Sequence, residues 1–282
     1  MIFNVGGTAE NAKKLGGKEP EYYIQPLNLL DNSDFTNPVN QLGQTNYTDN
    51  AYTIDRWLLQ SSSEKSALTI GTGNIQLANN AAIGKTIFTQ RLADLPFGVY
   101  TFALATNHGI TTVTTNVTGS NIDYPASPIG NSDWRININT EGAFPQVRVF
   151  DETANASTLM LYWAALYEGE YTAETLPPYV PKGYVEELAK CRMYYRPKEF
   201  LNCVKVSGQY FSISKNVEMF GVPTANMVSF SPYGFNNVTD FSGCTLTISQ
   251  IAKGVQQITY TSLPTCSEYF AGGLVVDLDS RL

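Results

Sequence analysis

The chain divides at the stretch Leu176-Pro-Pro-Tyr-Val-Pro-Lys-Gly-Tyr-Val-Glu-Glu-Leu-Ala-Lys-Cys-Arg-Met-Tyr-Tyr-Arg-Pro197. Its three prolines fix φ and remove backbone donors, so the first part is predicted to be extended. The extended part ends at Gly183, and a helical pattern follows as far as Tyr195. Because no comparable pattern flanks this stretch, residues 176–197 are predicted to be a Pro-rich hinge and short helix between two β-rich units.

The apolar residues of the predicted helix are spaced as in a coiled-coil seam, the heptad pattern by which helices associate. They follow one another at intervals of 4, 3 and 4 residues: Tyr184, Leu188, Cys191 and Tyr195. A helix of this length spans only about 18 Å and is not stable alone. The seam is therefore buried against the same chain or against copies of the chain around a symmetry axis, and the spacing leaves both alternatives open.

The composition favours an all-β protein. Charged residues make up only 15% of the 282 residues, against about 25% in an average soluble domain. Asn, Thr, Ser, Gln and Gly supply the polar groups, which is typical of strands and turns. Such surfaces suit protein or sugar contacts. A net charge of -7 without clustered Lys and Arg argues against nucleic-acid binding. No apolar run approaches the ~18 residues of a membrane span, so no membrane insertion is expected.

Short strand patterns separated by Gly, Pro and Asn turns recur through residues 27–175, which predicts an antiparallel β-sandwich, with a jelly roll as the preferred version. The expected strands are 67–71, 74–78, 85–91, 99–105, 111–118, 133–139, 146–150 and 158–167. A first strand and turn are expected at Asn28–Phe35, and a further strand at Tyr52–Leu59.

The two ends of the chain are predicted to differ. Residues 1–26 carry only a short helix signal at 8–17 and are expected to be an attachment segment. They lack the basic and apolar regions of a secretory signal, so none is expected. Residues 198–282 are predicted to form a second, smaller β-domain, with strands at 200–206, 210–213, 217–220, 227–230, 245–250, 256–260 and 274–278.

No convergent set of catalytic residues is visible, and the chain is expected not to be an enzyme. His108 is expected to be an exposed loop residue. The carboxylates considered for glycoside cleavage, which requires a pair, are expected to be solvated turn residues: Asp151, Glu152, Glu168 and Glu170. Four cysteines without C-x-x-C spacing argue against zinc and favour buried thiols.

Aromatic residues are the best candidates for sugar binding, because sugar rings stack on them. Trp57 and Trp163 lie within strand patterns and are expected in the core. Candidate carbohydrate-binding residues lie beside predicted turns: Trp134, Arg135, Tyr233 and Phe235.

Several segments resemble those of phage tail fibres. Asn28–Phe35, Tyr52–Trp57 and Leu161–Gly169 look like parts of the jelly-roll sandwich of such fibres, a fold that is also similar to carbohydrate-binding modules. Pro178–Pro181 with Glu187–Tyr195 resembles the segment before a fibre tip, and Leu15–Tyr23 resembles the approach from the fibre. The resemblance implies a structural and receptor-binding component of a phage or prophage tail. Its expected location is the virion tail, and its expected partners are upstream tail-fibre or baseplate proteins and host cell-surface polysaccharide.

The resemblance also implies a homotrimer, with Tyr184, Leu188, Cys191 and Tyr195 as the predicted contacts. Carbohydrate-binding jelly rolls often hold a structural calcium ion near the first strand. Asp31 and Asp34 would offer oxygen ligands here, although such residues also cap turns without metal; no other cofactor is expected. The alternatives are a secreted or surface carbohydrate-binding protein of a bacterium and, third, a glycan-cleaving depolymerase.

Overall fold

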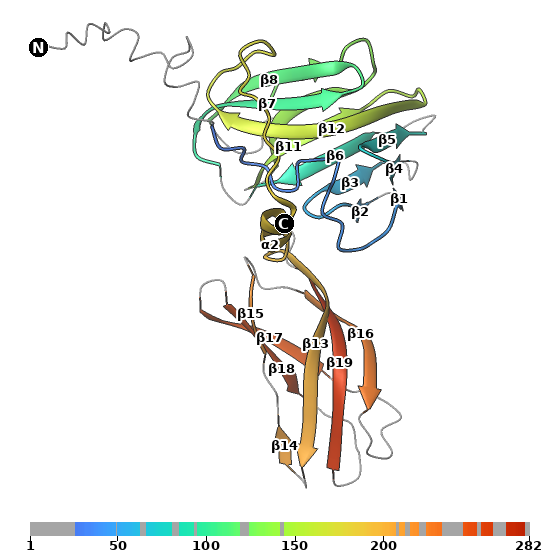
Figure 1. Ribbon diagram of the computed structural model, residues 1–282, viewed down its shortest axis with the longest axis vertical. Coiled ribbons are helices and arrows are strands. Elements are labelled where there is room, and N and C mark those ends of the chain that lie inside the picture. The colour runs from blue at the N-terminus through green and yellow to red at the C-terminus, as the bar shows by residue number, and fades with distance from the viewer. Residues whose placement is uncertain are drawn as a thin grey trace, which may run out of the picture.

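A computed structural model describes residues 26–48, 50–62, 66–80, 85–92, 95–118, 124–141, 144–206, 209–211, 215–219, 224–232, 245–252, 255–261 and 269–279. Side chains are described as far as Tyr195, except that of Glu141, and then for Met219, Leu278 and Asp279. The expected helix at 8–17 lies outside these residues. The described part is mostly β-strand with one α-helix, α2, which confirms the all-β prediction (Figure 1).

Two six-stranded antiparallel sheets form the part of the chain before α2. The first sheet contains, in spatial order, β1 (Asn46–Thr48), β4 (Ser66–Ile70), β5 (Ile75–Asn79), β12 (Ser157–Glu168), β7 (Gly98–Thr106) and β8 (Gly109–Val117). The second contains β2 (Ala51–Tyr52), β3 (Leu58–Ser61), β6 (Thr86–Arg91), β11 (Phe144–Asp151), β10 (Arg135–Glu141) and β9 (Ser127–Pro128). Successive strands cross repeatedly between the sheets; the specific jelly-roll assignment stays a prediction.

One hydrophobic core lies between these sheets and takes residues from both. Its centre is an aromatic group in which Trp57 stacks on Phe88, with ring centroids 4.7 Å apart, and meets the edge of Phe35 at 5.2 Å. All three side chains are fully buried. Burial of each large apolar side chain contributes about 2 kcal/mol, so this cluster anchors the sandwich. The prediction that Trp57 belongs to the core is confirmed.

The segment Asn28–Phe35 forms no regular strand, in contrast to the prediction. It runs beside β12 through isolated backbone bonds, such as Leu29 N to Leu166 O at 3.0 Å. The Asn28 side chain replaces part of the ladder, because its Oδ1 accepts from Leu166 N and its Nδ2 donates to Ala164 O. Side-chain bonds of this kind compete with regular pairing, which explains the irregular path.

The predicted strand Tyr52–Leu59 is interrupted: Tyr52 belongs to β2, Leu58 and Leu59 belong to β3, and residues 53–57 form the tight turn between them. Thr53 N donates to Trp57 O, and Trp57 N donates to Ile54 O. Arg56 occupies the turn with φ +75°, a conformation that costs energy outside glycine. The buried ring of Trp57 and the contacts of Arg56 described below hold this turn in place.

The helix α2 spans Tyr184–Cys191, four residues fewer than predicted. Gly183 is its N-cap, with φ -62° and ψ 139°. Residues 192–194 form a turn, and β13 begins at Tyr195. Pro197 favours extended backbone at Arg196, which fits the strand that follows the turn. The pairing of β13 also shifts register across Pro197, between Arg196 and Glu199.

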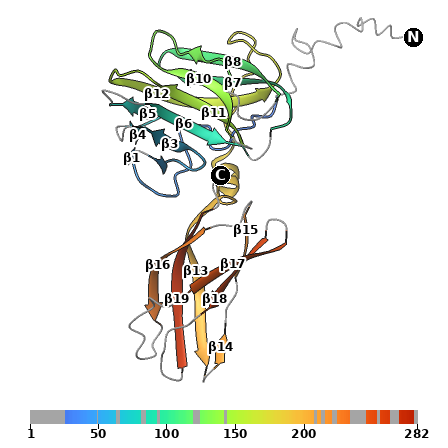
Figure 2. The same cartoon turned by 180° about the vertical axis from the view of Figure 1, so that it is seen from behind.

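Two further antiparallel sheets follow α2 (Figures 1 and 2). One contains β14 (Gln209–Phe211), β13 (Tyr195–Val206), β19 (Tyr269–Asp279) and β16 (Thr224–Pro232). The other contains β15 (Lys215–Glu218), β18 (Val255–Thr261) and β17 (Thr245–Ala252). Because Asp279 pairs with Tyr195, the last strand returns to the end of α2.

Candidate functional site

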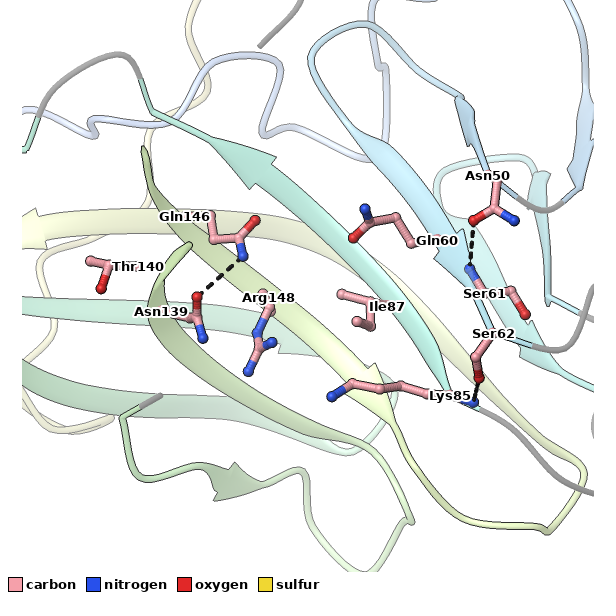
Figure 3. A pocket seen from close by; sticks show the side chains of 10 residues that line it. All are labelled: Asn50, Gln60, Ser61, Ser62, Lys85, Ile87, Asn139, Thr140, Gln146 and Arg148. Atoms are coloured by element: carbon pink, nitrogen blue, oxygen red, sulfur yellow. Dashed lines mark hydrogen bonds between the residues drawn. The ribbon is translucent and has the colours of Figure 1, made fainter. Parts of the chain in front are cut away.

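The outward face of the second sheet contains a pocket of about 510 Å³, within the usual ~300–1,000 Å³ of small-molecule sites. Figure 3 shows its lining side chains, which come from β3, β6, β10 and β11 and from three residues beside strands: Asn50 before β2, Ser62 after β3 and Lys85 before β6. The lining consists of Asn50, Gln60, Ser61, Ser62, Lys85, Ile87, Asn139, Thr140, Gln146 and Arg148. Apart from Ile87 all of these are polar, so the pocket is suited to a ligand that hydrogen-bonds.

The alternation of β11 determines which of its side chains reach the pocket. Val147 and Val149 are fully buried in the core, so Gln146 and Arg148 project from the opposite face of the strand. The neighbouring strand β10 alternates in the same way, and the pairing places Asn139 directly opposite Gln146. A single register thus separates a hydrophobic inner face from a polar outer face.

Hydrogen bonds within this outer face hold its side chains in position. Gln146 Oε1 accepts from Thr89 Oγ1 at 3.0 Å, and Gln146 Nε2 donates to Asn139 Oδ1 at 3.2 Å. Arg148 Nε donates to Asn137 Oδ1 at 3.0 Å. All five side chains are less than one-tenth exposed, although they lie on the outward face of the sheet. A ligand would meet groups that are already ordered, which lowers the entropic cost of binding.

Two cationic side chains flank one aromatic ring beside the pocket. The guanidinium carbon of Arg148 lies 5.2 Å from the ring centroid of Phe150, and Lys85 Nζ lies 5.7 Å from the same centroid. Both distances are within the ~6 Å range of cation–π contacts. Lys85 also forms an ion pair with the half-exposed Glu152. The pocket therefore combines positive charge with amide and hydroxyl groups.

A second polar cluster, which we call the junction cluster (Asp31, Arg56, Lys182 and Glu187), joins α2 and the segment before it to the sandwich. Glu187 Oε2 accepts a hydrogen bond from Asn32 N at 2.6 Å. Lys182 Nζ donates to Leu30 O at 2.6 Å and lies 3.8 Å from Glu187 Oε1. These contacts connect positions more than 150 residues apart in the sequence.

Arg56 supplies the other half of the junction cluster. Its Nε lies 3.5 Å from Asp31 Oδ2, and its Nη2 donates to Arg91 O at 2.9 Å. Its guanidinium carbon lies 3.4 Å from the ring centroid of Tyr194, directly after α2. Only 3% of the Arg56 side chain is exposed. This buried arginine therefore ties the turn before β3 to the end of the helix.

Burial opposes ionisation of the Lys182–Glu187 pair. It raises the pKa of Glu187, against the lowering effects of the Asn32 hydrogen bond and of Lys182. It likewise lowers the pKa of Lys182, against the attraction of Glu187 and Asp31. Both directions mean that desolvation outweighs the attraction, as is common for buried ion pairs. The pair therefore fixes the position in which α2 packs on the sandwich, and it adds little to the net free energy of folding.

The Pro-rich segment before α2 is also held against the sandwich. The Tyr179 ring stacks on Trp163 of β12, with centroids 4.6 Å apart and planes 4° apart. The Tyr179 hydroxyl lies 3.5 Å from Ser33 Oγ. Trp163, predicted to be a core residue, is half-buried on this surface. The segment predicted to be a hinge is thus docked along the strands that precede it.

The predicted carbohydrate-binding residues have different positions in the structure. Trp134 is fully buried, which corrects its assignment as a surface platform: the residue faces the core directly before β10. Arg135 is exposed and pairs with Phe150 on the sheet that carries the pocket, but it does not line the pocket. Tyr233 and Phe235 lie outside the described residues.

The candidate calcium ligands already have partners within the chain. Asp31 pairs with Arg56, and Asp34 Oδ1 accepts hydrogen bonds from Thr36 N and Thr36 Oγ1. Among the described residues, no group of three or more His, Cys, Asp or Glu side chains is arranged to hold a metal ion. The turn-capping alternative therefore accounts for Asp34 and an ion pair for Asp31, while calcium stays a prediction.

The predicted trimer contacts are divided between the surface and the interior of a single chain. Tyr184 is 46% exposed and Leu188 is half-buried, whereas Cys191 and Tyr195 are buried by their own chain. Burial also raises the pKa of the Cys191 thiol, so it is a poor nucleophile. For Cys191 and Tyr195 the structure favours burial within the chain, the first of the two alternatives.

The residues considered for catalysis have simple structural surroundings. Asp151, expected to be a solvated turn residue, is instead fully buried at the end of β11. Hydrogen bonds from Ser157 and Thr153 outweigh the effect of burial and hold its pKa below the ordinary value. It stabilises the turn after β11. His108 is exposed in the turn between β7 and β8, as expected. Glu168 and Glu170 are exposed near the end of β12.

None of the pocket residues was predicted from the sequence, because the predicted binding residues were aromatic side chains, and one arginine, beside turns. The available signal was the alternation Ile136-Asn-Ile-Asn139, followed after a short turn by Gln146-Val-Arg-Val149. Two adjacent strands with large polar residues at every second position indicate a polar outer face. Their contribution to one pocket with β3 and β6 depends on the strand order and could not be read from these segments.

Within the described part of the chain, α2 is too short to cross a membrane, and no other helix there is long and apolar enough. No protein-family model, curated protein or solved structure matches this chain.

Proposed function

We propose that this protein is a structural and receptor-binding component of a phage or prophage tail fibre, and that its sandwich recognises a glycan on the host surface. The observation that carries the glycan proposal is the ordered polar pocket on the outer face of β3, β6, β11 and β10. Amide, hydroxyl and guanidinium groups are what a sugar's hydroxyl groups bind. The resemblance of the flanking segments to tail fibres supports the biological setting.

Multivalency completes the proposal. In a homotrimer, three weak sites on one assembly act together through effective concentration. The exposed apolar residues before and at the start of α2 offer the contact between copies: Val180 is 53% exposed, Tyr184 46% and Val185 79%. Light scattering should then give three times the 31.0 kDa chain mass. A stable monomer at micromolar concentration would contradict the trimer and leave the glycan site unaffected.

A glycan array, followed by calorimetry with the best saccharide, tests the site. Gln60→Ala removes an amide from the pocket and should weaken binding about fivefold. Gln76→Ala is the matched control, because Gln76 is equally half-buried but lies on β5 of the other sheet. Equal binding by both variants and the unmodified protein would exclude the pocket as the site.

A further inference from the structure

Four basic side chains lie on or directly beside the sheet that carries the pocket. The chain has 25 acidic and 18 basic residues. Nevertheless, the strands β6, β10 and β11 and the residue directly before β6 supply four basic side chains: Lys85, Arg91, Arg135 and Arg148. Among the described side chains of these strands the carboxylate is Asp151, which is buried at the end of β11 and bonded to Ser157.

The pairing of strands brings these cations close to one another. Arg148 lies between Asn137 and Thr89, Gln146 lies opposite Arg91, and Phe150 lies opposite Arg135. Two of the cations, Lys85 and Arg148, line the pocket itself; Figure 3 shows Arg148 on β11 and Lys85 directly before the neighbouring strand β6. The nearby Glu152 is 53% exposed and pairs with Lys85, so it lies at the rim.

Partial burial increases the effect of this charge. Arg148 is 9% exposed, and the attraction between opposite charges grows as solvent is removed. A carboxylate matches the planar guanidinium geometry, and its charged hydrogen bonds are about twice as strong as neutral ones. A neutral sugar would use the amides and hydroxyls of the pocket but would bring no opposite charge to the two cations that line it.

We propose that the pocket selects an acidic saccharide, in which the carboxylate of a uronic acid unit lies between Lys85 and Arg148 while its hydroxyl groups bind the surrounding amides. This inference rests on the proposed glycan-binding function and adds the chemical class of the ligand. Glu152 would exchange its contact with Lys85 for solvent when the ligand carboxylate arrives.

The test uses the full chain and an array of uronic-acid oligosaccharides, each paired with its carboxyl-reduced neutral form. Binding of the acidic member at least about tenfold tighter than its neutral form is expected, and the preference should weaken as salt is added. Equal binding of both forms, or binding to sulfated saccharides alone, would overturn the carboxylate site and leave the glycan function standing. Binding to none of the saccharides would remove both.

Single substitutions locate the selectivity. Lys85→Gln and Arg148→Gln should each weaken binding of the acidic form about tenfold and leave the neutral form nearly unchanged. Lys190→Gln is the control, since Lys190 is also ion-paired, with Glu186, but lies on α2. Lys85 is 35% exposed, so its variant remains informative if Arg148→Gln does not fold. Equal weakening of both ligand forms would contradict the proposal.

Discussion

The pocket and the junction cluster use similar side chains for different purposes. Each places an arginine over an aromatic ring, Arg148 beside Phe150 and Arg56 over Tyr194, and each adds a lysine. At the junction the cations face Asp31 and Glu187 from the same chain. In the pocket Lys85 pairs with the half-exposed Glu152 at the rim, and both cations line a cavity together with amides and hydroxyls.

This difference distinguishes a structural cluster from a recognition site. Buried charges that meet opposite charges of the same chain fix the position of an element, here α2 on the sandwich. Charges held in place at the edge of a cavity remain able to meet a ligand. Four predictions test this difference between the pocket and the junction, and the contacts that hold α2 and the segment before it. They run from the largest expected effect to the smallest.

The two arginines should respond oppositely to substitution. Arg56→Gln should lower the free energy of unfolding by about 3 kcal/mol, because it breaks a buried ion pair and leaves Asp31 without that partner. It should not change ligand affinity. Arg148→Gln should instead reduce ligand binding. Urea unfolding followed by tryptophan fluorescence measures the first effect, since all three tryptophans precede α2. Loss of binding in Arg56→Gln at full folding would remove the distinction.

Glu187 should matter chiefly as a hydrogen-bond acceptor. Glu187→Ala leaves Asn32 N–H without its acceptor and should cost about 2 kcal/mol in the same unfolding measurement. Glu187→Gln keeps an acceptor and removes the charge, so its effect should stay within about 0.5 kcal/mol. If both variants lose equal stability, the ionic contact with Lys182 holds the junction instead.

The stacking of Tyr179 should hold the Pro-rich segment against β12. Tyr179→Ala removes the ring from Trp163 and should cost about 1 kcal/mol, with faster hydrogen exchange at the non-proline amides of residues 176–183. Tyr179→Phe keeps the ring and loses only the hydroxyl near Ser33, so exchange should be unchanged. Equal exchange in all three proteins would show that other contacts fix the segment.

Glu187 should also give a small pH dependence. Because its pKa is raised in the folded protein, the folded state takes up the proton first. Its contribution to stability is fully present below the unfolded pKa and is lost as pH rises through the folded pKa. Asp31, Lys182 and Lys190 also act on this carboxylate, so the readout is the stability difference from Glu187→Gln between pH 4 and 8. A difference independent of pH would contradict the raised pKa.

Much of the fold could be predicted from local patterns. The strands from β4 to β8 and from β10 to β12 lie close to their predicted positions, since alternation and turn residues are local signals. Predictions failed where a side chain replaced backbone pairing, as Asn28 does, and at the end of α2, where a turn and β13 replace the last four predicted helical residues. Trp134 was misjudged because its burial depends on the opposite sheet, which the neighbouring turn residues do not reveal.

The all-β class, the core position of Trp57 and the linking helix after Gly183 follow from local sequence patterns. Hydrophobic period, composition and proline chemistry are properties of neighbouring residues, so they are visible without a structure. Other relations are visible only in the folded chain. They include the face of each strand that meets the core and the joining of α2 to the sandwich by Arg56 and Glu187. The lining of one pocket by Lys85, Gln60 and Arg148 is another. These relations join residues far apart in the chain, and strand order and register alone bring them together.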